Sequence, residues 1–202
     1  MNAIRICLGA LVLAALLVAM QSGLRAAQTE DVFAFIPDGG RTLLVKIMHT
    51  RPPAEEARAL LTSKRTREEW VKYLQGHVTA VPALKALDKK AVETLADYLS
   101  FHMPLPAKTI PADLAKADWA KVLPKDGRDL TMENCQFCHI ITVVVTQERP
   151  QAHWLGTMNK PSHVEIELNA KQREELANFL VINGGIPVDL IPEDLRAGGA
   201  SY

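Results

Sequence analysis

Apolar residues near the middle of this chain of 202 residues recur at the spacing of an α-helix. Val92, Leu95, Tyr98 and Leu99 form one apolar stripe. Asp88 lies just before it, where an N-cap residue is expected, because a carboxylate there accepts a backbone N–H of the first turn. Patterns of this kind recur along the chain and predict a mainly α-helical fold.

A similar pattern follows near the C-terminus. It begins at Asn169, and Gln172 three positions later completes a capping-box arrangement. Gly184 and Gly185 predict where this helix ends. Its apolar stripe consists of Leu176, Phe179 and Leu180.

Two further helices are expected from local signals. Thr66 is a predicted N-cap for a helix that carries Trp70. Residues 151–160 are expected to be helical through Trp154 and to end before Pro161, because a proline disfavours the helical conformation in the residue before it.

The two clearest helices belong to an internal repeat. Residues 92–114 align without a gap with residues 173–195, at an offset of 81 positions. Similar amphipathicity alone would give shared apolar spacing, but not the Ile-Pro-x-Asp-Leu that ends both segments. The pattern therefore predicts a tandem duplication into residues 28–114 and 115–202. Nine of the 23 columns are identical: Glu93/Glu174, Leu95/Leu176, Ala96/Ala177, Leu99/Leu180, Pro106/Pro187, Ile110/Ile191, Pro111/Pro192, Asp113/Asp194 and Leu114/Leu195.

The first 27 residues have the pattern of a secretory signal peptide. Arg5 supplies a positive charge, residues 6–20 carry no charge, and Ala26 or Ala27 is a candidate cleavage point. Leu24 or Arg25 would stand three residues before the cleaved bond, where a small residue is usual. An uncleaved N-terminal anchor is therefore the alternative. The uncharged run is, however, shorter than the roughly 20 apolar residues of a membrane-spanning helix. The sequence thus predicts export to the periplasm, with anchoring to the inner membrane only if the leader stays.

Outside this leader the chain is close to neutral. The whole sequence has 23 basic and 23 acidic residues, and the leader holds two of the basic ones, Arg5 and Arg25, so the remainder carries a formal charge of −2. A nucleic-acid partner calls for a concentrated basic face, which this composition argues against. The charge also gives no long-range sign for steering a redox partner.

Cys135-Gln136-Phe137-Cys138-His139 has the C-x-x-C-H spacing of a covalent haem attachment site. Two thiols three positions apart add to the two vinyl groups of one haem, and the adjacent histidine becomes the proximal iron ligand. A zinc half-site or a redox-active dithiol would also use C-x-x-C. Zinc would need a second ligand pair, whereas the only other cysteine, Cys7, lies in the leader. A redox dithiol would be expected in a βαβ pattern, which the chain lacks. We therefore expect one covalently bound haem c.

A run of seven β-branched residues, 140–146, follows His139 directly. A short extended segment against the haem edge and a piece of hydrophobic core are both compatible with it. The sequence does not decide between them.

A helix leading into C-x-x-C-H, a looser middle and a C-terminal helix with an aromatic–Leu pair together resemble a class I cytochrome c. The resemblance covers the second half of the chain and, in degenerate form, the first. Arg149-Pro150 and Trp154 after the motif also resemble the dihaem cytochrome portion of quinohaemoprotein amine dehydrogenases and the small cytochrome subunits of sulfite dehydrogenases. The resemblance implies two tandem cytochrome c-like helical domains that drain electrons from a dehydrogenase.

The first repeat departs from a dihaem protein because residues 28–114 contain no cysteine. Met48-His49 stands near where Cys138-His139 would fall, so this repeat is expected to have lost its haem. His49 and His77 are candidates for holding a non-covalent haem, but a structural role or the docking of a partner is the expectation for this repeat.

The sixth iron ligand is expected among three residues of the second half. His163 stands about as far ahead of the C-terminal aromatic–Leu pair as the ligand of a class I cytochrome does, and it is the first choice. Met158 is the alternative, one helical turn after Trp154, in the usual place of a core methionine. His153 points elsewhere on that helix. Axial methionine raises the reduction potential relative to histidine, so this choice sets the expected potential.

Two supporting residues complete the predicted site. Trp154 is expected to pack on the haem edge, with plain core packing as the alternative. Arg149 is a candidate donor to a haem propionate, with a solvated side chain as the alternative.

The sequence therefore predicts an exported monohaem c-type cytochrome that transfers single electrons as subunit or partner of a periplasmic oxidoreductase, and not an enzyme by itself. An open-site haem protein acting on peroxide or a small gas is one alternative. A docking subunit whose first repeat binds a partner protein is another.

Overall fold

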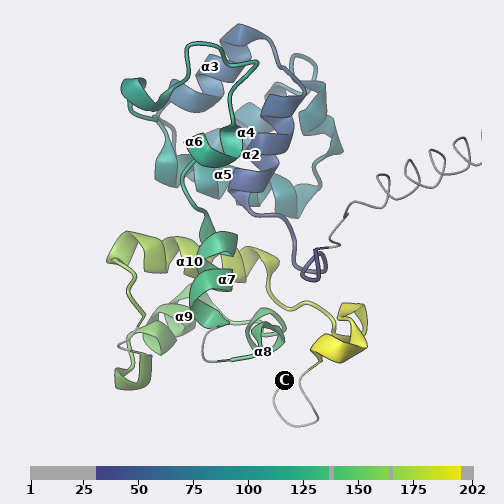
Figure 1. Ribbon diagram of the computed structural model, residues 1–202, viewed down its shortest axis with the longest axis vertical. Coiled ribbons are helices and arrows are strands. Elements are labelled where there is room, and N and C mark those ends of the chain that lie inside the picture. Colours follow the sequence, from purple (N-terminus) through teal and green to yellow (C-terminus); the bar gives the residue numbers. More distant parts are fainter. Residues whose placement is uncertain (1–30, 137–138, 164–165, 197–202) are drawn as a thin grey trace, which may run out of the picture. The chain divides into compact units, whose positions relative to one another are not determined.

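Nine α-helices and five short 3₁₀ helices form the part of the chain that a computed structural model describes, residues 31–136, 139–163 and 166–196 (Figure 1). These residues include no strand, so the expected mainly α-helical fold is confirmed for them. None of their helices is long and apolar enough to cross a membrane. The predicted leader and Cys138 lie outside the described residues.

The first part of the chain contains α2 (Gly40–His49), α3 (Ala54–Thr62), α4 (Arg67–Gly76), η1 (Pro82–Ala86), α5 (Lys89–His102) and η2 (Ala107–Thr109). The second part contains α6 (Trp119–Val122), α7 (Gly127–Cys135), α8 (Ile141–Val145), α9 (Gln151–Met158), η3 (Pro161–His163), α10 (Ala170–Asn183), η4 (Val188–Leu190) and η5 (Glu193–Leu195).

The helix caps read from the sequence are confirmed. Thr66 and Glu69 form a reciprocal capping box at the start of α4, and the Asp88 carboxylate accepts the N–H of Ala91 in α5. Asn169 makes the capping box of α10, which ends at Gly184. Each cap satisfies a backbone donor that the first turn of a helix leaves without a partner.

The β-branched run after His139 forms a helix, α8, and the extended alternative was wrong. Ile141, Thr142 and Val145 are buried. Burial of this face outweighs the modest helix penalty of β-branched side chains, which is a few tenths of a kcal/mol per residue. Two other members of the run, Val143 and Val144, line a cavity.

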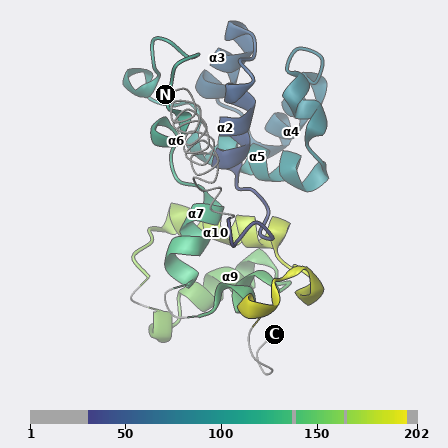
Figure 2. The ribbon, with the colours of Figure 1, turned by 45° about the vertical axis from the view of Figure 1, so that its right-hand side comes forward.

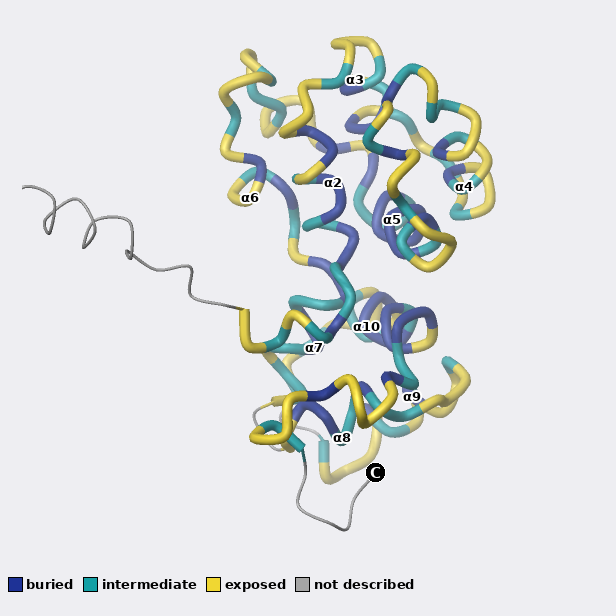
Figure 3. Tube along the Cα trace, turned by 90° about the vertical axis from the view of Figure 1, so that its right-hand side faces the viewer, coloured by how far each residue is buried: buried dark blue, intermediate teal, exposed yellow. Residues whose placement is uncertain are grey.

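The helices from Phe35 onward belong to one compact unit. α5 packs against α2 and α4, and α10 packs against α7, α9 and α5 (Figure 2). Both α5 and α10 carry long buried stretches along their length (Figure 3). They are the helices against which α2, α4, α7 and α9 pack.

Two glycines let helices approach closely. A Cβ atom on Gly40 of α2 would lie 2.1 Å from Cβ of Tyr98 in α5. A Cβ on Gly127 of α7 would lie 2.5 Å from Cβ of Phe179 in α10. Tyr98 and Phe179 are 81 positions apart and the two glycines 87, so each half of the chain contains a close helix crossing at a glycine.

Asp126 lies where the first turns of α2 and α7 meet. Its Oδ1 accepts the N–H of Asp129 in its own helix, and its Oδ2 accepts the N–H of Arg41 in α2, 2.7 Å away. Gly39, the N-cap of α2, has no side chain to offer and leaves room for this carboxylate. One aspartate therefore caps two helices. Burial, followed by the nearby Asp129, raises the pKa of Asp126.

From α7 to η4, the second half repeats the element order of the first, because α7, α8, α9, η3, α10 and η4 follow one another as α2, α3, α4, η1, α5 and η2 do. α5 and α10 begin 81 positions apart and have the same length, and η2 and η4 follow them with the same offset. The predicted duplication gives an explanation for this spacing and stays a prediction.

Candidate functional site

A cavity of about 230 Å³ lies between α7, α8, α9 and α10 in the second half of the chain. Most of its walls are apolar side chains, and a few polar groups converge on it, as in a typical ligand site. Its lining residues are Asn134, Cys135, His139, Val143, Val144, Gln147, Arg149, Trp154, Thr157, Met158, His163, Ile166, Leu176 and Leu180.

Every predicted site residue that the structure describes lines this cavity. Cys135 is the last residue of α7, whose first turn is fixed by the Asp126 cap. His139 follows shortly after, and its N–H donates to the carbonyl of Cys135 at 3.3 Å. Cys138, the second predicted attachment residue, lies outside the described residues.

The imidazole rings of His139 and His163 face the same space. Their ring centres are 6.4 Å apart and their planes are tilted by 38°. Imidazole nitrogens bind metal ions at about 2.0–2.1 Å, so two rings on opposite sides of one ion have centres roughly 6.3–6.5 Å apart. The observed spacing fits an ion held between these two histidines.

One of the two ring nitrogens of His163 has a hydrogen-bonding partner close by in the chain. Nδ1 of His163 lies 3.2 Å from Oγ of Ser162, within hydrogen-bonding distance. Metal-binding histidines commonly use their second ring nitrogen in this way, because the bond fixes the orientation of the ring. The arrangement leaves Nε2 of His163 available for a metal.

Met158 reaches the same cavity from the last turn of α9 and is 5 % exposed. The structure therefore brings both candidates for the sixth ligand to one place. His153, the third residue considered, is exposed and is not part of the cavity wall.

Trp154 and Arg149 form one corner of the cavity. Trp154 is 5 % exposed, and its Nε1 is buried without a hydrogen-bond partner. The guanidinium of Arg149 lies 5.2 Å from the centre of the Trp154 ring, and the side chain is exposed. Both side chains are donors that suit an acidic group on a bound molecule, such as a haem propionate. The residues present thus fit a haem. The pair is not specific to this cavity, because the guanidinium of Arg65 lies 4.7 Å from the centre of the Trp70 ring, and Nε1 of Trp70 is also buried without a partner.

The zinc alternative stays open, because Cys138 lies outside the described residues. Among the described residues, no three His, Cys, Asp or Glu side chains gather closely enough to hold a metal ion. A structural zinc normally has four protein ligands.

The first half of the chain places its histidines differently. His49 is exposed at the end of α2. His77 stacks on Tyr73, with ring centres 3.8 Å apart, and its Nδ1 lies 2.8 Å from the carbonyl oxygen of Tyr73.

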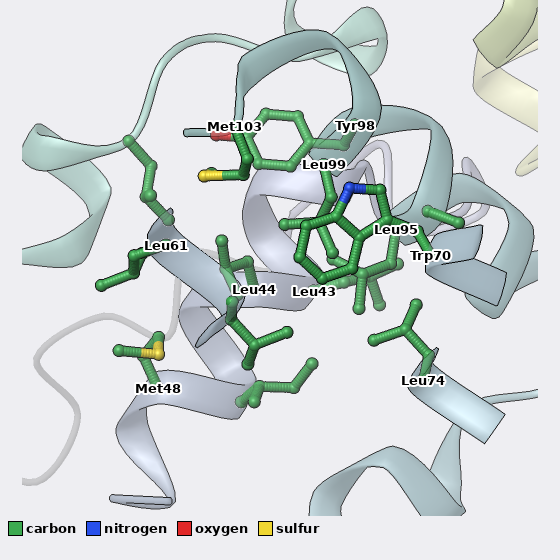
Figure 4. Close-up of a cluster of buried hydrophobic side chains, with 14 of the residues drawn as sticks. Leu43, Leu44, Met48, Leu61, Trp70, Leu74, Leu95, Tyr98, Leu99 and Met103 are labelled. Carbon is green, nitrogen blue, oxygen red and sulfur yellow. The ribbon is translucent and has the colours of Figure 1, made fainter. Parts of the chain in front are cut away.

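The first half contains a cluster of buried apolar side chains, which includes Trp70, Leu74, Leu95 and Met103 (Figure 4). Trp119 and Leu123, from α6 and the residue after it, belong to the same buried cluster, so residues beyond 114 complete this core. Neither His49 nor His77 lines the cavity of about 350 Å³ that lies beside Met48 and Arg51.

Sequence reasoning missed one polar residue at the edge of the site. Arg173 on α10 donates to the backbone of the segment that carries His163. The one available signal was the repeat itself, because the equivalent position in the first half is Val92.

Comparisons with protein-family models, with curated proteins and with solved structures find no match to this chain.

Proposed function

We propose that this protein is an exported monohaem c-type cytochrome that transfers single electrons. One observation carries the proposal: Cys135 and His139 of the C-x-x-C-H motif share a largely apolar cavity with His163, and the ring centres of the two imidazoles are 6.4 Å apart, a spacing at which both could bind one metal ion. The resemblance to class I cytochromes c points in the same direction.

Each residue has a definite task in this proposal. Cys135 and Cys138 would hold the haem through thioether bonds, and His139 and His163 would bind its iron. When bound, the haem supplies an iron that changes between the ferrous and ferric states. Trp154 and Arg149 bind the propionate side of the haem. Leu176, Leu180 and the other apolar lining residues exclude water from it.

The first half serves as a permanent partner of the haem-carrying half. Asp97 of α5 accepts a hydrogen bond from Asn178 of α10 at 2.9 Å, and His102 of α5 lies 2.7 Å from Glu175 of α10. These contacts support a structural role for the first repeat. Binding of a redox partner, such as a periplasmic dehydrogenase, fits the same arrangement.

An open-site haem protein acting on peroxide or a small gas is the competing proposal. It needs an iron with a free coordination position. The ring centres of His163 and His139 are 6.4 Å apart, which supports His163 as a sixth ligand instead. Met158, in the same cavity, offers a second possible ligand.

The proposal is tested with the full chain expressed with its leader in a bacterium that attaches haem c. A pyridine haemochrome spectrum counts haems per chain, and we expect one that stays bound after denaturation. Oxidised and dithionite-reduced spectra are expected to be low-spin, with a sharp reduced α-band. A high-spin protein that binds carbon monoxide readily would replace the electron-transfer proposal with the open-site one. The absence of covalent haem would refute both.

A further inference from the structure

The side chain of Arg173 spans the segment between α9 and α10 from inside. Its Nε donates to the carbonyl of Leu168 at 2.9 Å, Nη1 to that of Met158 at 2.5 Å, and Nη2 to that of Ile166 at 2.8 Å. Three separate peptide groups of one segment are thus joined to a single guanidinium on α10. A hydrogen bond from a charged donor is stronger than one between neutral groups.

The segment held in this way carries His163. The N–H of Ile166 donates to the carbonyl of His163 at 3.1 Å, and the N–H of His163 donates to the carbonyl of Lys160 at 2.9 Å. Ile166 therefore links Arg173 to His163, because its carbonyl accepts a hydrogen bond from Arg173 and its N–H donates one to the carbonyl of His163. Met158, at the start of the segment, is bound directly.

The repeat shows that this position is not required for the helix itself. Val92 takes the place of Arg173 in α5, which has the same length and a similar cap. The half without an attachment motif lacks the arginine, and the half with the motif has it.

We propose that Arg173 is a positioning residue, which holds residues 158–163 and 166–168 so that His163 stays directed at the iron. The inference rests on the proposed function, because it assigns a role to Arg173 in keeping the sixth ligand bound. Arg173 does not line the cavity itself, but it donates to the carbonyls of Met158 and Ile166, which do, so its effect passes through the backbone.

Arg196 supplies a matched control within the chain. It is also half-buried, and it also donates to backbone carbonyls, those of Ile191 at 3.0 Å and Asp189 at 3.3 Å. These carbonyls belong to the segment after α10, which contributes no residue to the cavity wall. R196Q therefore removes the same kind of contact away from His163.

The experiment compares the rate of carbon monoxide binding to the ferrous wild-type protein, R173Q, R173K and R196Q, each as the full haem-loaded chain. Carbon monoxide must take the place of the sixth ligand, so its rate reports how often His163 leaves. We expect R173Q to bind at least about tenfold faster, because it loses hydrogen bonds from a charged donor. R173K, which keeps the charge, should lie between, and R196Q should stay within about twofold of wild type.

Two further measurements separate positioning from general loosening. In the H163A background, R173Q should add nothing to the rate, since the ligand through which it acts is gone. Amide hydrogen exchange of His163 and Ile166 should be faster in R173Q and unchanged in R196Q, and circular dichroism should show that both variants are folded.

Equal rates for R173Q and R196Q would overturn the inference while leaving the proposed function intact, and so would an effect of R173Q that persists in H163A. If R173Q does not fold, R173K decides in its place by the same comparisons. A wild-type protein without covalent haem would overturn the proposed function and this inference together.

Discussion

Met158 at the end of α9 and His163 at the end of η3 line the same cavity. As ligands they would give an iron centre different reduction potentials. His163 has the ring spacing to His139 and a hydrogen-bonding partner at Nδ1, whereas Met158 is buried in the last turn of α9. A buried methionine in a helix is commonly a packing residue. The geometry therefore favours His163 as the ligand.

Replacing the two residues one at a time tests this choice. H163A is expected to lose the low-spin spectrum and to bind carbon monoxide, because the iron is left with one protein ligand. M158L should keep the low-spin spectrum and lose less than about 1.5 kcal/mol of stability, as volume-conserving core changes do. Visible spectra and urea unfolding of the haem-loaded proteins measure both effects. The reverse pattern, with M158L high-spin and H163A unchanged, would assign the ligand to Met158.

Part of this site is visible in the sequence and part is not. C-x-x-C-H is recognisable because attachment to one haem demands that spacing along the chain. Trp154, Met158 and His163 are close to the motif in sequence, so their meeting in one cavity follows from short connections. Arg173 was not recognised, because its partners are backbone carbonyls, and the one signal in the sequence was its difference from Val92 at the equivalent position of the first half.

At the scale of elements, two helix crossings depend on the lack of a side chain. A Cβ on Gly127 would lie 2.5 Å from Cβ of Phe179 and 2.6 Å from the carbonyl oxygen of Glu175. By contrast, a Cβ on Gly156 in α9 would have no atom within 4 Å. Substitution by alanine should therefore change the free energy of unfolding in opposite directions at Gly127 and at Gly156.

G127A is expected to lower the free energy of unfolding by about 1–3 kcal/mol, because α7 must move away from α10. G156A should raise it by about 0.5–1 kcal/mol, because alanine is the better helix former in an open position. Urea denaturation followed by circular dichroism compares both with wild type. If G127A were as stable as wild type, the close crossing of α7 and α10 would be wrong.

The sequence predicted three helices from clear N-cap residues and α9 from Trp154 and the following Pro161, whereas α2, α3 and α8 gave no such signal. Asp88, Thr66 and Asn169 place a polar side chain directly before an apolar stripe, and such local signals survive in the fold. α8 was not predicted because its side chains favour strands and only tertiary burial makes the helix stable. The cap of α2 comes from Asp126, which is 85 positions away from Arg41 in the chain.

At the scale of the whole molecule, the buried contact between α5 and α10 is polar. Asp97 and Asn178, which are hydrogen-bonded, are 81 positions apart and thus occupy equivalent places in the two repeats. The side-chain amide of Asn183 donates to Oγ1 of Thr94 at 2.9 Å. At an offset of 81, Thr94 corresponds to Glu175 and Asn183 corresponds to His102. Glu175 and His102 are also hydrogen-bonded to each other. Equivalent residues that meet in this way indicate that a two-fold relation connects the two helices. It fits an ancestor in which two copies of one helix packed together.

This interface gives the protein a distinct pH dependence. Burial raises the pKa of Asp97 from 3.8 to about 6, and the hydrogen bond from Asn178 and the charge of Arg67 offset only part of that rise. Between these two pH values the folded state holds more protons than the unfolded state, so stability falls as pH rises. The stabilising effect of the neutral form is complete at low pH and is lost by the time the pH has passed about 6.

D97N removes this titration while keeping an oxygen that can accept the hydrogen bond from Asn178. At pH 8 we expect D97N to be more stable than wild type by about 1–3 kcal/mol, because a shift of one pKa unit corresponds to about 1.4 kcal/mol. Near pH 4 the two proteins should be about equally stable, because Asp97 is then protonated in wild type. The pH dependence should become shallower but not vanish, since burial also raises the pKa of Asp126. Urea unfolding at several pH values measures this, and a D97N protein less stable than wild type at pH 8 would show that the charged carboxylate stabilises the interface.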